Sequence, residues 1–98
     1  MFCMIAHNQI LPGKAEATAK MVEKEFIPVM KKTPGFRGCY LVTGPKGEYT
    51  AILLFNDRAG ADAYAASPDR KKALGTMKGL VAGDMKVEFG DVPLAVTA

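Results

Sequence analysis

The first segment of the chain, residues 2–11, is apolar on both of its alternating rows before it turns polar. Phe2 and Met4 begin one row, and Cys3 and Ile5 begin the other. Successive side chains of a strand point to opposite faces of its sheet, so both faces of this strand need cover from water. The segment therefore predicts a central strand that is packed on both sides.

Patterns farther along the chain predict the order βαββαβ. Apolar positions at three- and four-residue steps indicate a helix over residues 14–32. Two segments over residues 36–43 and 48–55 are typical of strands joined by a glycine-rich hairpin. A second helical region follows over residues 57–80, and residues 85–89 are predicted to form the fourth strand.

Connection rules favour one antiparallel sheet for this order, with the first and third strands central and both helical regions on one face. The other face would then leave a broad apolar patch around Ile5 in water, and a second copy of the chain is its simplest cover. The predicted fold is therefore α+β, a ferredoxin-like domain that pairs through its sheet into a dimeric α/β barrel. We expect the pairing to bury well over ~1,000 Å².

Specific residues mark the bends and ends of the helical regions. Pro28 is expected to kink the first region, because it removes a backbone hydrogen bond. The buried stripe of that region is predicted to consist of Ala15, Ala19, Val22, Phe26 and Met30. Asp57 is a candidate N-cap of the second region, and Ser67 is a candidate cap of a further segment that begins at Pro68.

The C-terminal part carries two further signals. Gly83-Asp84 predicts a turn that precedes the fourth strand. Residues 92–96 are apolar enough to continue an edge pairing after a kink. We therefore expect a short fourth strand with a second extended piece behind it.

The composition is that of one globular domain spanning residues 1–98. The chain is 49% hydrophobic and 23% charged, which argues against disorder. The net charge is +3, and the basic residues are scattered along the chain. Their densest groups, Lys31-Lys32 and Arg70-Lys71-Lys72, are interpreted as solvated helix ends rather than as a patch for an anionic partner.

The two cysteines, Cys3 and Cys39, make no metal-binding spacing with the single histidine, His7, so no metal site is expected. The third strand should separate the two thiols by more than a disulfide can bridge. The N-terminal apolar run is too short for a signal peptide, and no segment approaches the ~20 apolar residues of a membrane span. We expect a cytoplasmic protein with free thiols and no membrane partner.

Four short motifs stand at the element ends: Leu11-Pro12-Gly13-Lys14, Pro34-Gly35-Phe36-Arg37-Gly38, Phe55-Asn56-Asp57 and Tyr64-Ala65-Ala66-Ser67-Pro68. On the basis of these motifs, the chain resembles the antibiotic-biosynthesis-monooxygenase-like group of the dimeric α/β-barrel proteins. The resemblance covers nearly the whole chain. The resemblance implies a homodimer with a cavity between helices and sheet. Members of the group bind a polycyclic phenol or quinol there without metal or flavin, and polar side chains stabilise its anion while it reacts with oxygen.

The sequence departs from the group at two positions. Members commonly carry a tryptophan where Phe55 stands and a histidine where Tyr64 stands. The haem-degrading branch uses an asparagine on the first strand, which Asn8 matches, together with that tryptophan and that histidine. Because the histidine is missing from residues 64–66, we expect neither iron ligation by that route nor haem degradation.

Asn8, Tyr64 and His7 are the candidate catalytic residues. An amide at Asn8 could donate to an enolate or phenolate oxygen in the cavity, or it could be paired with backbone at the strand end. His7 could act as a general base or could sit at the dimer face. Strand alternation places His7 and Asn8 on opposite faces of the sheet, which argues against a joint mechanism. Tyr64 stands where the group has its histidine, but it could equally be a core aromatic.

The predicted substrate-binding residues are Phe55, Val22 and Phe26 as cavity walls and Arg37 as a clamp for an anion near the mouth. The default interpretation of Arg37 is a solvated residue at a strand start. The alanine-rich segment 59–66 would leave room for the cavity, unless its helix packs closer and fills the space.

Three classes of function follow. The first is a cofactor-independent monooxygenase-like enzyme that acts on a small aromatic or quinol-type substrate. The second is a non-catalytic small-molecule-binding or stress-type accessory protein with the same cavity. An RNA-recognition domain shares the βαββαβ order, but the third strand lacks the stacked aromatic pattern, so no nucleic-acid partner is expected.

Overall fold

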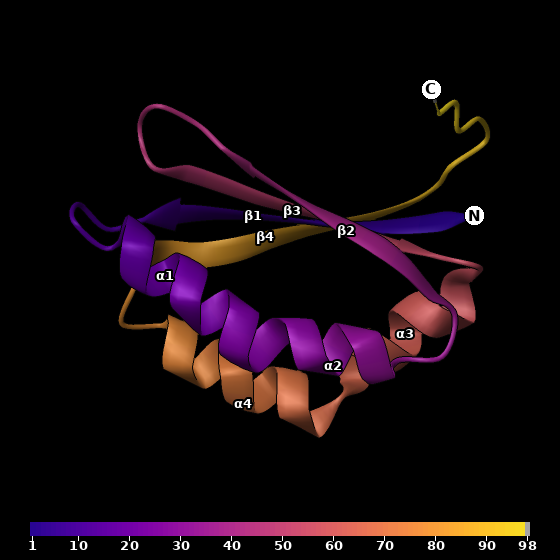
Figure 1. Ribbon diagram of the computed structural model, residues 1–98, viewed down its shortest axis with the longest axis horizontal. Helices are drawn as coiled ribbons and strands as arrows, with labels where there is room; N and C mark the ends of the chain where they lie inside the picture. The colour runs from indigo at the N-terminus through magenta and orange to yellow at the C-terminus, as the bar shows by residue number, and fades with distance from the viewer. Residues whose placement is uncertain (98) are drawn as a thin grey trace.

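Four antiparallel strands form a single sheet in the computed structural model, which describes residues 1–97 (Figure 1). The strands are β1 (Phe2–Ile10), β2 (Phe36–Thr43), β3 (Glu48–Phe55) and β4 (Val81–Asp91). Their order, β2-β3-β1-β4, places the first and third strands in the centre, as predicted. β3 separates the strands that carry Cys3 and Cys39, and both cysteines are free.

The helices pack on one face of this sheet (Figure 1). They are α1 (Ala15–Met21), the π-helical turn η1 (Val22–Phe26), α2 (Ile27–Lys32), α3 (Arg58–Ala66) and α4 (Pro68–Met77). Both predicted caps are confirmed: Asp57 Oδ1 accepts a hydrogen bond from the Gly60 N–H at 3.2 Å, and Ser67 Oγ accepts one from the Arg70 N–H at 3.4 Å. None of the helices described for residues 1–97 is long and apolar enough to cross a membrane.

The first helical region accommodates Pro28 through a π-helical turn. Pro28 has no N–H to donate to the carbonyl of Lys24, so the regular α-helical pattern fails there. The helix widens just before it, and the Ile27 N–H donates to the carbonyl of Val22, five residues back. The predicted irregularity is therefore present, but it lies over η1 and the helix continues through Pro28 into α2.

The buried stripe of this region differs from the prediction in its first half. The second half is confirmed, with buried side chains at Val22, Phe26 and Met30. Ala15 and Ala19 are exposed, whereas Thr18 and Met21 are buried. Thr18 tolerates burial because its hydroxyl donates to the carbonyl of Lys14 at 2.7 Å.

The fourth strand is longer than predicted and begins earlier. It starts at Val81, so Gly83-Asp84 lies within the strand and not in a turn before it. Gly83 adopts a left-handed φ of +70°, and the pairing register shifts at this point, so the residues form a bulge. The helix before it is correspondingly shorter and ends at Met77 rather than near Leu80.

The predicted edge pairing of residues 92–96 is wrong. These residues form no strand, and the chain runs away from the sheet there (Figure 1). One backbone hydrogen bond holds the start of this segment, from the Val92 N–H to the carbonyl of Met1 at 2.9 Å. Apolarity alone was therefore not sufficient to extend the ladder beyond Asp91.

The two faces of the sheet differ in their cover. The helix-facing side chains of β1 and β3 are mostly buried, and Met4 and Leu53 are each only 1% exposed. The opposite side, here called the open face, carries the partly or largely exposed apolar side chains Cys3, Ile5, Tyr40, Val42, Ile52 and Leu54. Tyr40 is 64% exposed and Val42 is 53% exposed.

Candidate functional site

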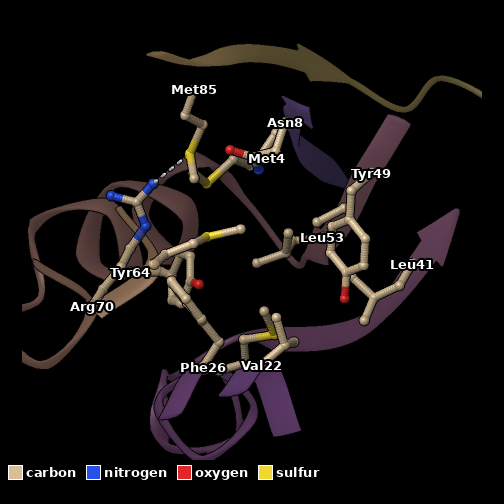
Figure 2. A pocket seen from close by; sticks show the side chains of 14 residues that line it. Met4, Asn8, Val22, Phe26, Leu41, Tyr49, Leu53, Tyr64, Arg70 and Met85 are labelled. Carbon is tan, nitrogen blue, oxygen red and sulfur yellow. Dashed lines mark hydrogen bonds between the residues drawn. The ribbon is translucent and has the colours of Figure 1, made fainter. Parts of the chain in front are cut away.

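A cavity of about 30 Å³ lies between the sheet and the helices (Figure 2). Most of its walls are apolar, and four of the six methionines of the chain line it: Met4, Met30, Met77 and Met85. The space holds about one or two water molecules, so a larger ligand requires side chains to move. Methionine is unbranched and changes rotamer readily, so these walls can adapt to a ligand.

Asn8 lies on the sheet side of the cavity, opposite the bulge of β4. On either side of it β1 pairs regularly, His7 with Lys86 and Gln9 with Ala82, so residues 83–85 stand against Asn8 alone. Its side chain is partly exposed and forms no hydrogen bond with residues 1–97. The structure therefore does not show the backbone pairing that was the alternative for Asn8, and its amide is free to donate.

A second hollow of about 190 Å³ adjoins the cavity between α4 and β4. Gly83 of the bulge and Lys78 line it and are exposed, and the residues that line both hollows are Asn8, Met77 and Met85. These three side chains stand between the inner cavity and the outside. The hollow is therefore the mouth of the site, and the bulge positions Asn8 beside it.

Arg70 is buried in the cavity wall, which corrects its interpretation as part of a solvated helix end. It is only 8% exposed and lies in the first turn of α4. Arg70 is buried because it lies three and seven residues before Ala73 and Met77, on the same face of α4, and these three residues form the buried stripe of the helix. The sequence shows this helical spacing, but the run of three basic residues, 70–72, favoured the interpretation as a solvated helix end.

The Arg70 guanidinium has few partners in this position. It lies 5.3 Å from the ring centroid of Tyr64. It also donates to the carbonyl of Ala65 at 3.4 Å and to the sulfur of Met85 at 3.9 Å, both long contacts. Figure 2 shows it on the same side of the cavity as Met85 and Tyr64.

Tyr64 contributes a neutral phenol to the same space. Burial raises its pKa above the ordinary value of 10.0, and the neighbouring Arg70 guanidinium offsets part of this by stabilising the phenolate. Tyr49, which also lines the cavity, has a pKa raised mainly by burial. Both phenols are therefore protonated at neutral pH and can donate a hydrogen bond to a ligand.

The raised pKa of Tyr64 predicts a loss of stability at high pH. Above about pH 10 the unfolded chain releases the Tyr64 proton before the folded chain does, so the free energy of unfolding falls as the pH rises toward the folded-state pKa. Tyr64→Phe should make that fall shallower, as measured by urea unfolding across alkaline pH. The same substitution at exposed Tyr40 is the control. An unchanged pH dependence in Tyr64→Phe would contradict the prediction.

His7 lies on the open face and not in the cavity. Its Nε2 is 2.8 Å from Glu88 Oε2, and its Nδ1 is 3.3 Å from Thr50 Oγ1. The structure thus places His7 and Asn8 on opposite faces of the sheet, as strand alternation requires. Among residues 1–97 no three His, Cys, Asp or Glu side chains gather as they would around a metal ion.

The cavity brings together Asn8, Tyr64, Val22 and Phe26, but not the other two predicted binding residues. Phe55 is fully buried behind the wall, with its ring centroid 6.0 Å from that of Tyr64. Arg37 is exposed at the start of β2, where it donates to Asn56 Oδ1 at 3.0 Å. Neither side chain lines the cavity, so neither could contact a ligand there without rearrangement.

The alanine-rich helix α3 packs closely, which accounts for the small volume. Ala61 is fully buried, and a Cβ added at Gly60 would lie 3.2 Å from the Phe55 ring. Over this part of α3 the helix therefore packs against the sheet closely enough to fill the space, which was the alternative to a cavity there. The remaining space lies beside Tyr64 and α4.

Solved structures share this fold. An antibiotic biosynthesis monooxygenase matches with a TM-score of 0.77 at 20% identity, covering 94% of this chain and 98% of that chain. A protein of unknown function from Nitrosomonas europaea gives 0.82 at 14% identity, with 99% and 93% covered. Rv0793 from Mycobacterium tuberculosis gives 0.77 at 18% identity, with 99% and 98% covered. No protein-family model and no curated protein matches the sequence.

The likeness extends over nearly the whole of both chains in each case. The chain therefore has the α+β ferredoxin-like fold of the antibiotic-biosynthesis-monooxygenase-like proteins, as the sequence motifs predicted. A fold of this kind hosts many activities, so the chemistry has to be argued from the cavity itself.

Proposed function

We propose that the chain is a small cofactor-independent oxygenase that acts on an aromatic or quinol-type molecule in the cavity. The observation that carries the proposal is the convergence of the Asn8 amide, the Tyr64 phenol and the Arg70 guanidinium on one mainly apolar space. A site with apolar walls and a few convergent polar groups is what a small organic ligand requires. The shared fold with an antibiotic biosynthesis monooxygenase supports the same class of chemistry.

In the proposed reaction, the substrate loses a proton to form an enolate or phenolate, and the donors of the cavity stabilise the new negative charge. Asn8 stands at the mouth, where the proton can pass to solvent. For an anthrone-type substrate, a ring methylene loses both hydrogens and becomes a carbonyl. One oxygen atom of O₂ enters the product and the other leaves as water, and the substrate supplies all four electrons.

One observation favours a second candidate, a non-catalytic small-molecule-binding protein. Among the residues that line the cavity, the titratable side chains are Tyr49, Tyr64 and Arg70, and none of these is a base at neutral pH. Histidine or carboxylate bases are usual where an enzyme removes a proton. Oxygen consumption with anthrone or quinol substrates separates the two candidates, because a binding protein would take up the ligand without consuming oxygen.

We further propose that the chain functions as a homodimer in the cytoplasm. The support for the dimer is the open face, where exposed Tyr40 and Val42 adjoin Ile5 and Ile52. An apolar surface of this kind is costly to leave in water and suits a self-complementary contact. The free cysteines are consistent with a reducing compartment.

Asn8→Ala tests the catalytic interpretation. If Asn8 donates to the developing anion, the variant should lose about 10²–10³-fold in turnover, or about 2.7–4 kcal/mol of barrier stabilisation. Stability should change little, because the side chain has no hydrogen bond to lose among residues 1–97. Asn56→Ala removes an exposed amide outside the cavity, together with its hydrogen bond from Arg37, and should leave turnover unchanged, so it is the control for amide loss. A variant that loses thermal stability while oxygen consumption is unchanged would show that Asn8 is structural.

A further inference from the structure

We propose that the ligand of the cavity is an apolar molecule that already carries a negative charge at neutral pH, and that this charge lies against Arg70. The inference rests on the proposed function in that it takes the cavity to be the ligand site, and it adds the class of molecule that fits. The ligand would have a hydrophobic body and one carboxylate or comparably acidic oxygen.

The first argument is the cost of burying Arg70. Transferring a guanidinium out of water costs several kcal/mol unless a counter-charge or strong hydrogen bonds compensate it. Among residues 1–97 no carboxylate pairs with Arg70, although carboxylates lie within 4.0 Å of His7, Lys20 and Arg58. The guanidinium has five N–H donors. It donates to one carbonyl and one sulfur, both at long distance, and the Tyr64 phenol is its other polar neighbour. Most of its capacity is therefore free for a ligand.

The second argument is the position of Arg70 in its helix. The first turn of a helix carries partial positive charge, which favours an acidic side chain and disfavours a basic one. Arg70 lies in the first turn of α4, and the neighbouring Asp69 is exposed and does not pair with it. The carbonyl of Ala65 and the ring of Tyr64 offset only part of this. An anion in the cavity would supply the counter-charge that the guanidinium lacks in this position.

The third argument is the chemistry of the other walls. The other polar side chains that line the cavity, Asn8, Tyr49 and Tyr64, are uncharged and can each donate a hydrogen bond, and none of the lining residues within 1–97 is acidic. Asp84 lines the mouth rather than the cavity, and Lys78 lines the mouth as well. The site thus presents donors and one positive charge within apolar walls, which suits an anion and disfavours a cation.

Matched probes test the proposal: naphthoate and its uncharged analogue naphthamide, titrated into the full chain and followed by NMR. We expect naphthoate to bind about tenfold or more tightly than naphthamide, as for a charge-assisted hydrogen bond in a dry site. Arg70→Met should abolish that preference while leaving thermal stability unchanged or higher, because it removes a buried charge without a counter-charge. Arg58→Met is the control, since Arg58 also lies over an aromatic ring but is exposed.

Arg70→Gln covers the case in which Arg70→Met does not fold, because it keeps polar donors and removes the charge. Equal affinity of the wild type for the two probes, or an unchanged preference in Arg70→Met or Arg70→Gln, would overturn the proposal. The outcome is separable from the proposed function. Oxygen consumption without a preference for the anionic probe would contradict only this inference. An Arg70-dependent preference without oxygen consumption would contradict only the proposed oxygenase activity.

Discussion

Ile52→Glu is expected to convert the proposed dimer into a monomer at micromolar concentration. Ile52 lies on β3 in the open face, paired with Ile5 on one side and with Tyr40 on the other. In a symmetric dimer the substitution places two carboxylates in the interface, each without a partner, at a cost of several kcal/mol. Each 1.4 kcal/mol weakens association about tenfold, so dissociation should increase by more than about 100-fold.

Light scattering at several concentrations measures this directly. Ala63→Glu introduces the same charge on the exposed side of α3, away from the open face, and should leave the dimer intact. The Ile52 variant should keep its secondary structure, because Ile52 is only partly buried within one chain. A wild-type protein that is monomeric under these conditions would refute the proposed dimer without the variant.

The first three strands could be predicted closely from local patterns. The bounds of β2 and β3 match the predicted ranges at both ends, because glycines and prolines flank β2 and precede β3, and Asn56-Asp57 follows β3. The central position of β1 followed from its two apolar rows. In both cases the information is local or depends on alternation alone, which a sequence displays directly.

The polar groups of the cavity were harder to predict because they depend on tertiary packing. A glycine with positive φ serves a turn and a bulge equally well, and only the pairing of β4 with β1 shows that Gly83 belongs to a bulge. Basic residues in a run are usually solvated, and only the packing of α4 shows that Arg70 is not. The sequence therefore identified Asn8 but not its surroundings.

Phe55→Ala is expected to destabilise the folded chain by about 3–5 kcal/mol, the usual loss for a large aromatic side chain removed from a core. Phe55 is fully buried and contacts two aromatic neighbours, Phe36 at 5.9 Å and Tyr64 at 6.0 Å between ring centroids. Because a small domain has only about 5–15 kcal/mol of total stability, this is a large share. Urea unfolding at a fixed protomer concentration measures it, since the stability of the proposed dimer depends on protomer concentration.

Two further substitutions separate the structural role of Phe55 from the predicted role in binding. Phe55→Trp restores the residue common in the group that the chain resembles, but Gly60 packs so closely against the ring that the larger side chain should cost about 1–3 kcal/mol. Phe55→Leu should lose less stability than Phe55→Ala, and it should change ligand affinity only by displacing Tyr64. If Phe55→Leu lowers affinity and leaves both stability and the Tyr64 environment unchanged, Phe55 contacts the ligand directly, as the sequence suggested. The packing predicts the opposite, because the ring lies behind Tyr64 and is closed off from the cavity.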